Sequence, residues 1–255
     1  MEIVLIGAGN VATHLGKAFV EAGHQILQVY SRTAHSANSL ASQVGAEGIC
    51  CLADLSNKAD LYIVSVKDDA LETVVREACR GRENGLFVHT AGSMPMSVFD
   101  GSCQRYGVVY PMQTFSKEKP LSFSEIPIFI EANHEDVLMQ LETFARQLSS
   151  KVYRLSTEAR RNLHLSAVFA CNFVNQCYAI ADELLQEEGV PFEVLLPLID
   201  ETARKVHVLS PREAQTGPAV RWDENVIQKH LALLEGHPLY ADIYRMMSKA
   251  IHALR

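Results

Sequence analysis

The first dozen residues constrain the fold more than any other stretch. Residues 3–6, IVLI, are apolar, the glycine-rich loop GAGNVA follows at 7–12, and a helix-compatible segment covers 11–22. A short, continuously apolar run that ends in glycine predicts a strand covered on both faces. A glycine-rich turn between such a strand and a helix is typical of doubly wound α/β folds.

The same alternation continues through the first half of the chain. Helices are expected at 11–22, 34–44 and 69–80, and apolar runs predict strands at 2–7, 24–30, 59–66, 85–91 and 106–111, with a weaker one at 47–50. A strand at 126–131 and a helix at 134–149 extend this layer. Repeated strand–helix–strand order predicts a parallel sheet with helices on both faces.

The pattern changes near residue 156, after which strands are almost absent. One long helix is predicted from Ser156 or Thr157, as N-cap, to Gly189, and further helices at 192–209, 224–235 and 238–254. The predicted fold class is α/β, a Rossmann-type doubly wound parallel sheet over residues 1–155 followed by an all-α C-terminal domain over 156–255.

Composition excludes several classes of function. A net charge of −7 argues against a general nucleic-acid binder, and no stretch is long and apolar enough to span a membrane. No signal peptide is visible, because Glu2 precedes only a short apolar run. The six cysteines show neither a Cys-x-x-Cys pair nor zinc-finger spacing, so no metal site is expected and a reducing cytoplasm fits.

The glycine loop has the G-x-G-x-x-A form of a dinucleotide fingerprint. Gly7 suits the tight turn, Gly9 lets the backbone approach a pyrophosphate, and Ala12 allows close helix packing. The helix N-terminus at Asn10 and Val11 offers N–H groups to the phosphates. The alternative is a glycine-rich turn in an α/β protein that binds no nucleotide.

The end of the second predicted strand discriminates between two cofactors. NAD-binding chains usually place an acid there for the ribose 2′-hydroxyl, whereas this chain has Ser31, Arg32 and Thr33 and no acid between Glu21 and Glu47. Arginine and two hydroxyls can donate to a 2′-phosphate, so NADP is predicted in preference to NAD. The alternative is that Arg32 is a solvated surface charge.

Loops after three other strands are expected at the same edge, because ligands of open α/β sheets bind outside the carboxyl ends of the strands. The alternative is that these residues only form turns. The candidates are Ser65, Val66 and Lys67 near the ribose, Thr90, Gly92 and the candidate catalytic Ser93 near the nicotinamide, and Gln113 and Thr114 toward the substrate.

Polar side chains interrupt the long helix, which is otherwise apolar nearly all round between 163 and 185 and therefore expected to be buried. At about 100° per residue, His164, Val168, Asn172 and Asn175 share one face. His164 could act as general acid toward a carbonyl or imine, and Asn172 could orient the substrate with Asn175. The alternative is structural hydrogen bonding to neighbouring helices.

A second polar cluster covers residues 214–231. Thr216 lies in a predicted turn, and Arg221 is a candidate clamp for a carboxylate or phosphate of the substrate. Asp223 is the expected N-cap of the next helix. The alternative for Arg221 is a salt bridge, for which Asp223 is a partner.

With these stretches the chain resembles a bacterial family of Rossmann-like oxidoreductases whose C-terminal helical domain is a domain of unknown function. The resemblance is carried by GAGNVATHL, SVKDDAL, HTAGS, YPMQTF, HLSAVFACNFV and TGPAVRWDENVIQKHL. The family looks like a branch of the superfamily of 6-phosphogluconate dehydrogenase, pyrroline-5-carboxylate reductase and ketopantoate reductase. It implies an NADP-binding domain over 1–155 and a helical domain over 156–255, similar to the C-terminal domain of 6-phosphogluconate dehydrogenase, that often forms a homodimer.

The resemblance does not identify the substrate of this protein. Ketopantoate reductases carry a lysine and then asparagines at four-residue steps on a long interdomain helix, where this chain has His164, Val168 and Asn172. The Ser-Gly-Pro-Ala-Tyr run of pyrroline-5-carboxylate reductases is missing from the sequence.

The leading hypothesis is an NADP-dependent oxidoreductase acting on a small polar, carboxylate-bearing substrate in the interdomain cleft. The main alternative is a non-catalytic NADP(H)-binding sensor or regulatory module. A third is a small-molecule binder that has lost its nucleotide.

Overall fold

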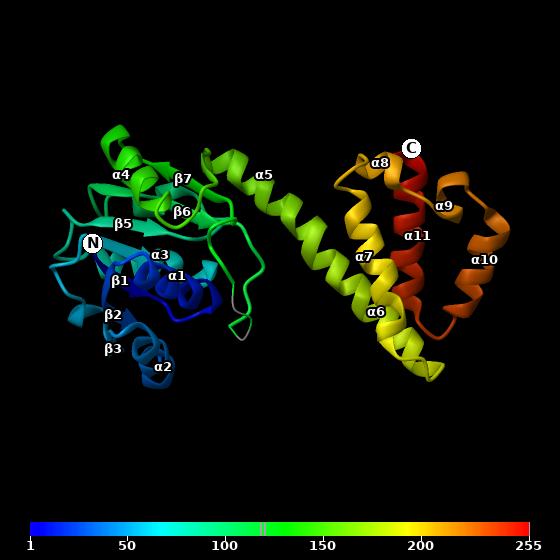
Figure 1. The fold of residues 1–255 in the computed structure, drawn as a ribbon, viewed down its shortest axis with the longest axis horizontal. Helices are drawn as coiled ribbons and strands as arrows, with labels where there is room; N and C mark the ends of the chain where they lie inside the picture. Colours follow the sequence, from blue (N-terminus) through cyan, green and yellow to red (C-terminus); the bar gives the residue numbers. More distant parts are fainter. Residues whose placement is uncertain (118, 120, 255) are drawn as a thin grey trace. The chain divides into compact units, whose positions relative to one another are not determined.

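The chain divides into two compact units, Met1–Cys171 and Asn172–Arg255 (Figure 1). The computed structural model describes residues 1–117, 119 and 121–254. The last strand ends at Arg154, and the next helix, which begins at Thr157, is part of the first unit. A domain boundary at about residue 155 stays a prediction.

The first unit is a sheet of eight strands with helices on both faces, as Figure 1 shows. Every strand and helix predicted before residue 155 is present. A short strand near residue 153 is additional, and its three residues, VYR, are too few to show an apolar run. The strands are β1 (Glu2–Ile6), β2 (Gln25–Tyr30), β3 (Glu47–Ile49), β4 (Leu61–Val64), β5 (Leu86–His89), β6 (Arg105–Pro111), β7 (Ile128–Ala132) and β8 (Val152–Arg154); the helices are α1 (Asn10–Glu21), α2 (Ala34–Val44), α3 (Asp68–Cys79), α4 (Glu135–Ala145) and α5 (Thr157–Ala167), with 3₁₀ turns η1 (Leu52–Asp54) and η2 (Met96–Phe99).

The strand order is β3-β2-β1-β4-β5-β6-β7-β8, and all neighbours are parallel except β6 and β7. This confirms the predicted Rossmann-type sheet. The chain winds outward in both directions from β1 and β4, so the order reverses between these two strands. Such a switch point leaves an open crevice at the carboxyl ends of the strands.

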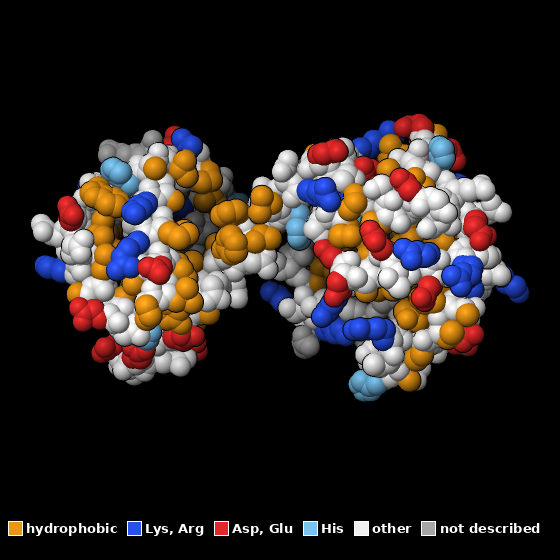
Figure 2. Space-filling view, turned by 180° about the vertical axis from the view of Figure 1, so that it is seen from behind, with side chains coloured by type: hydrophobic (Ala, Val, Ile, Leu, Met, Phe, Trp, Pro, Cys, Tyr) orange, Lys and Arg blue, Asp and Glu red, His pale blue; other side chains and the backbone are white. Residues whose placement is uncertain are grey.

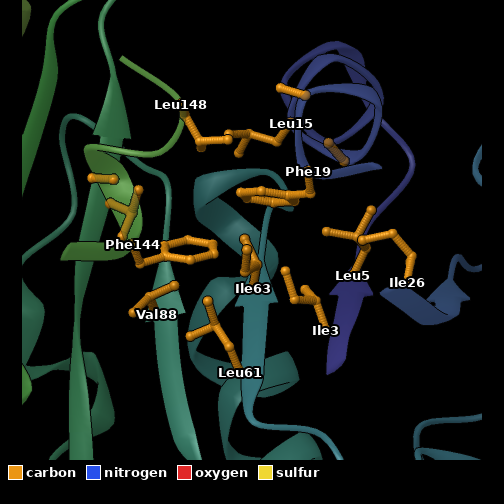
Figure 3. Packing of buried hydrophobic residues seen from close by; sticks show 14 of the residues in the cluster. Ile3, Leu5, Leu15, Phe19, Ile26, Leu61, Ile63, Val88, Phe144 and Leu148 are labelled. Carbon is orange, nitrogen blue, oxygen red and sulfur yellow. The ribbon is translucent and has the colours of Figure 1, made fainter. Parts of the chain in front are cut away.

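Two apolar layers hold the helices on the sheet. Helices α1, α2 and α4 pack on one face, where the rings of Phe19 and Phe144 lie 5.1 Å apart. Helix α3 covers the other face with η1 and η2. Figure 3 shows the first layer, in which side chains of the helices meet Ile3, Leu61, Ile63 and Val88 of the strands.

The second unit is helical. The predicted helices at 192–209, 224–235 and 238–254 are present, and each ends before its predicted last residue. Asp223 is the N-cap of the second, as predicted, and its side chain accepts from the N–H of Val226 at 3.3 Å. Among the described helices, none combines the length and apolar character needed to cross a membrane. The helical elements are α6 (Val174–Glu187), η4 (Phe192–Leu195), α7 (Leu196–Lys205), α8 (Pro211–Ala214), α9 (Pro218–Arg221), α10 (Glu224–Leu233) and α11 (Pro238–Ala253).

The long helix differs from its prediction in two respects. Val168–Phe173 forms a π-helical turn, η3, between α5 and α6, so the regular 100° spacing assumed from His164 to Asn175 does not hold through this turn. The expectation of burial is wrong for the single chain, because none of the described residues 161–190 is buried. Their side chains are covered only partly by the chain's own neighbouring elements.

Candidate functional site

A pocket of about 290 Å³ opens at the switch point. It lies where β1, β2 and β4 end, so its walls come from the loops that follow these strands. The pocket brings together seven of the predicted cofactor residues: Gly7, Gly9, Ser31, Arg32, Ser65, Val66 and Lys67.

The two glycines of the loop serve different purposes. Gly7 has φ +126°, and a Cβ there would lie 2.1 Å from the carbonyl oxygen of Ser65, so the crossing of the two loops requires glycine. Gly9 has φ −80°, which any residue can adopt, and a Cβ there would have no described atom within 4 Å. The missing side chain at Gly9 therefore leaves open space rather than relieving a contact, as a cradle for a pyrophosphate requires.

The exposed guanidinium of Arg32 lines the pocket at the start of α2. Thr33 lies outside the pocket lining and is the N-cap of α2: its Oγ1 accepts from the N–H of Ser36 at 3.3 Å and donates to the Ser36 hydroxyl at 3.0 Å, and its contact with a cofactor stays a prediction. Ser36 lines the pocket beside Arg32. Its place in the first turn of α2 is the signal that could have found it.

Four other predicted cofactor residues lie outside the pocket lining: Asn10, Val11, Thr90 and Gly92, the last of which lies beside His164. Asn10 donates from its side chain to the carbonyl of Phe115 at 2.8 Å and so ties the loop after β6 to α1. Val11 packs against the first apolar layer. Thr90 is buried and donates from its hydroxyl to that of Ser65 at 3.1 Å, which couples the loops after β4 and β5.

The loop after β5 passes very close to His164 of α5. A Cβ at Gly92 would lie 2.6 Å from Nδ1 of His164 and 2.9 Å from Cζ of Tyr110, so this approach requires glycine. The Tyr110 hydroxyl and His164 Nδ1 are 3.1 Å apart, within hydrogen-bond distance. Burial raises the pKa of Tyr110, and the charge of Arg160 offsets part of this shift. The Tyr110 hydroxyl therefore keeps its proton at neutral pH.

A buried ion pair lies beneath this loop. Arg160 is 1% exposed, and its guanidinium lies 2.7 Å from a carboxylate oxygen of Glu131. It also donates to the carbonyls of Ala91 and Met94, while Glu131 accepts from the N–H of Thr157 at 2.9 Å. The pair thus joins the loop after β5, strand β7 and the start of α5.

Ser93 is held by two contacts of its own. Its hydroxyl donates to the carboxylate of Asp68, and its carbonyl accepts from Nε of Arg161 at 2.8 Å. Gln113 and Thr114 are exposed and bond to each other, the Thr114 N–H donating to Gln113 Oε1 at 2.8 Å. Catalytic and substrate-binding roles for these three residues stay predictions.

The remaining candidates belong to the second unit. Asn172 is exposed, and Asn175 lines a groove with residues of α6 and η4. Thr216 and Arg221 are exposed, and Arg221 forms no ion pair with Asp223 or any other described acid. Their proposed contacts with a substrate stay predictions.

Three residues of this region were missed by sequence reasoning: Tyr110, Arg160 and Arg161. Tyr110 belongs to the quoted stretch YPMQTF, and the two arginines precede His164 by one helical turn. A search for polar residues one turn from His164 would have found the arginines. The described residues contain no group of three or more His, Cys, Asp or Glu side chains placed to hold a metal ion.

Buried His89 makes the stability of the first unit depend on pH. It is 0% exposed, its Nδ1 accepts from the N–H of Ala91 at 3.1 Å, and its Nε2 has no hydrogen-bond partner in the described chain. Burial, together with the charge of Arg160, lowers the pKa of His89 from 6.5 to about 3. The folded protein therefore binds fewer protons than the unfolded chain between these two values.

We expect acidification from pH 7 to pH 5 to lower the free energy of unfolding by about 2 kcal/mol through His89. This contribution is complete above pH 6.5 and is lost as pH falls toward 3. Urea denaturation of the wild type and of His89→Gln at both pH values measures it. An identical pH dependence in the two proteins would contradict the assignment.

Two family descriptions match the chain. "NADP oxidoreductase coenzyme F420-dependent" matches residues 2–91, and a domain of unknown function, DUF2520, matches residues 126–251. A solved structure, a "putative NADP oxidoreductase" from Bacteroides fragilis, is 52% identical, covers 99% of this chain and 98% of its own, and superposes with a TM-score of 0.95. The chain belongs to this DUF2520 oxidoreductase family. No curated protein matches it.

Two more distant structures share the fold of the DUF2520 family. An imine reductase from Myxococcus stipitatus in complex with NADP+ is 19% identical, with 99% of this chain and 92% of that chain covered and a TM-score of 0.68. A reductive aminase from Aspergillus terreus in complex with NADPH and ethyl-5-oxohexanoate is 17% identical, with the same coverage and a TM-score of 0.70. At these identities the likeness extends to the fold alone.

Proposed function

We propose that the protein is an NADP-dependent oxidoreductase that reduces a carbonyl or imine of a small polar, carboxylate-bearing substrate. The observation that carries the proposal is the close approach of Gly92 to the Tyr110–His164 pair, at the sheet edge that also holds the dinucleotide pocket. The name of the 52% identical relative supports the same class.

The pocket fits a dinucleotide phosphate. Gly7, Gly9 and the N-terminus of α1 would hold the pyrophosphate, because α1 directs unpaired N–H groups toward it. Arg32, with the hydroxyls of Ser31 and Ser36, would bind a 2′-phosphate. Ser65 and Lys67 would lie along the ribose and Thr90 and Gly92 toward the nicotinamide. Bound NADPH would supply the hydride.

His164 is the proposed proton donor. In its imidazolium form, His164 would donate its Nδ1–H to the Tyr110 hydroxyl oxygen and give its Nε2 proton to the substrate, which leaves a neutral imidazole. Tyr110 then fixes both the orientation and the tautomer of His164. The buried Arg160–Glu131 pair keeps the loop that carries Gly92 in place against this histidine.

The cofactor assignment is tested by Arg32→Ala. We expect this change to weaken NADPH binding about tenfold to a hundredfold and to leave NADH binding nearly unchanged, because only NADPH carries the 2′-phosphate. Titration of the purified protein with each cofactor, followed by melting temperature, measures both affinities without a substrate.

Arg76→Ala is the matched control, since Arg76 is exposed on α3 and lies outside the pocket lining. Equal weakening of both cofactors by Arg32→Ala would refute the 2′-phosphate contact. No melting shift of the wild type with either cofactor would refute the dinucleotide site. Binding of NADPH without turnover of any carbonyl or imine would favour a sensor.

We further propose a homodimer formed through the helical unit, in the cytoplasm. Large apolar side chains remain exposed in the single chain, among them Leu196 at 46% and Leu198 at 64%, and Figure 2 shows hydrophobic side chains gathered on this unit, at the left of that view. A second copy would cover such a surface. All six cysteines are free, as a reducing compartment requires. Light scattering would give the mass in solution.

A further inference from the structure

Arg161 is held at the loop that faces His164. It follows Arg160 on α5, and its Nε donates to the carbonyl of Ser93 at 2.8 Å. This bond uses one donor of the guanidinium. The two terminal nitrogens have no hydrogen-bond partner among the described residues, and the side chain is exposed. The bond from Nε to Ser93 holds the guanidinium of Arg161 in place, and its two terminal nitrogens are available to bind a ligand at the site.

Arg161 also forms no ion pair with any of the described residues. Glu131 neutralises the neighbouring Arg160, whereas no acid in the described part of the chain pairs with Arg161. Asp68, which lies close by, is occupied by the hydroxyl of Ser93. The local charges, Arg160 and Arg161 against Glu131 and Asp68, are balanced in number, but the terminal nitrogens of Arg161 have no carboxylate partner among the described residues and can bind one directly.

The spacing on α5 limits how far this anion can lie from the reacting group. Arg161 and His164 are three residues apart within one α-helix, which places their Cβ atoms about 5–6 Å apart. A molecule that reaches both side chains therefore carries its carboxylate close to the oxygen or nitrogen that His164 protonates. A carboxylate on the adjacent carbon meets this requirement.

We propose that Arg161 binds the substrate carboxylate and thereby selects 2-oxo acids or 2-imino acids. This inference rests on the proposed reductase function. In the reaction the carbonyl carbon gains a hydrogen with two electrons from NADPH, and the oxygen gains a proton through His164. The C=O double bond becomes a C–O single bond, so a 2-oxo acid becomes a 2-hydroxy acid and NADPH becomes NADP+. A 2-imino acid becomes a 2-amino acid in the same way.

The test uses oxamate, which has a carboxylate next to an amide carbonyl and resembles a 2-oxo acid, and oxamide, its uncharged counterpart. Wild type, Arg161→Gln and Arg76→Gln are first titrated with NADPH alone. The NADPH-saturated proteins are then titrated with each probe, followed by melting temperature. Pyruvate, 2-oxoisovalerate and phenylpyruvate, each with its methyl ester, are assayed for NADPH oxidation.

We expect oxamate, but not oxamide, to stabilise wild type and Arg76→Gln. Arg161→Gln should weaken oxamate at least tenfold and leave NADPH affinity unchanged, and the acids should be reduced in preference to their esters. Unchanged oxamate binding in Arg161→Gln, or no response of the NADPH-bound wild type to any of the acids, would overturn the role of Arg161. Failure of the wild type to bind NADPH would instead overturn the proposed function.

Discussion

His164→Ala is expected to lower kcat by about 10²- to 10⁴-fold and to leave NADPH affinity unchanged. The substitution removes the proposed proton donor but touches none of the residues that line the dinucleotide pocket. Rates of NADPH oxidation with the best carbonyl or imine substrate, together with NADPH titrations, give the two quantities.

Tyr110→Phe separates orientation from proton donation. It removes the hydroxyl that lies 3.1 Å from His164 Nδ1 and keeps the ring. We expect a smaller loss of kcat than for His164→Ala and a displaced pH–rate profile, because the histidine loses its partner but remains in place. If His164→Ala keeps its turnover, the histidine has a structural role only.

Glu131→Gln is expected to lower the free energy of unfolding by about 3–5 kcal/mol, because it leaves the charge of Arg160 buried without its partner. The Arg160 side chain is 1% exposed and that of Glu131 is 17% exposed, so water replaces little of the lost interaction. Urea denaturation measures the change.

Glu125→Gln is the matched control, since it removes one partner of the exposed Lys151–Glu125 pair. Exposed pairs contribute less than about 1 kcal/mol, so this variant should be nearly as stable as the wild type. The double variant Arg160→Met/Glu131→Leu should be more stable than Glu131→Gln, because no unpaired charge remains. Equal losses for Glu131→Gln and Glu125→Gln would show that burial does not strengthen the inner pair.

The sheet could be predicted because its information is local. Apolar runs and intervening helical segments are visible in short windows, and their repeated strand–helix–strand order predicts a parallel sheet with helices on both faces. Strand β8 was missed because three residues that pair only at the sheet edge carry no periodic signal. The π-helical turn at Val168–Phe173 was missed because the sequence there is compatible with a regular helix.

Part of the candidate site could likewise be predicted from local sequence, and part could not. By itself the sequence determined that a glycine loop follows a buried strand and that Arg32 replaces the usual acid, since both depend on neighbours along the chain. Only the tertiary structure decided that Gly92, Tyr110 and His164 meet, that Glu131 neutralises Arg160, and that Arg161 remains unpaired. These facts join residues from separate elements, whose distances are set by how the loops and α5 pack on the sheet.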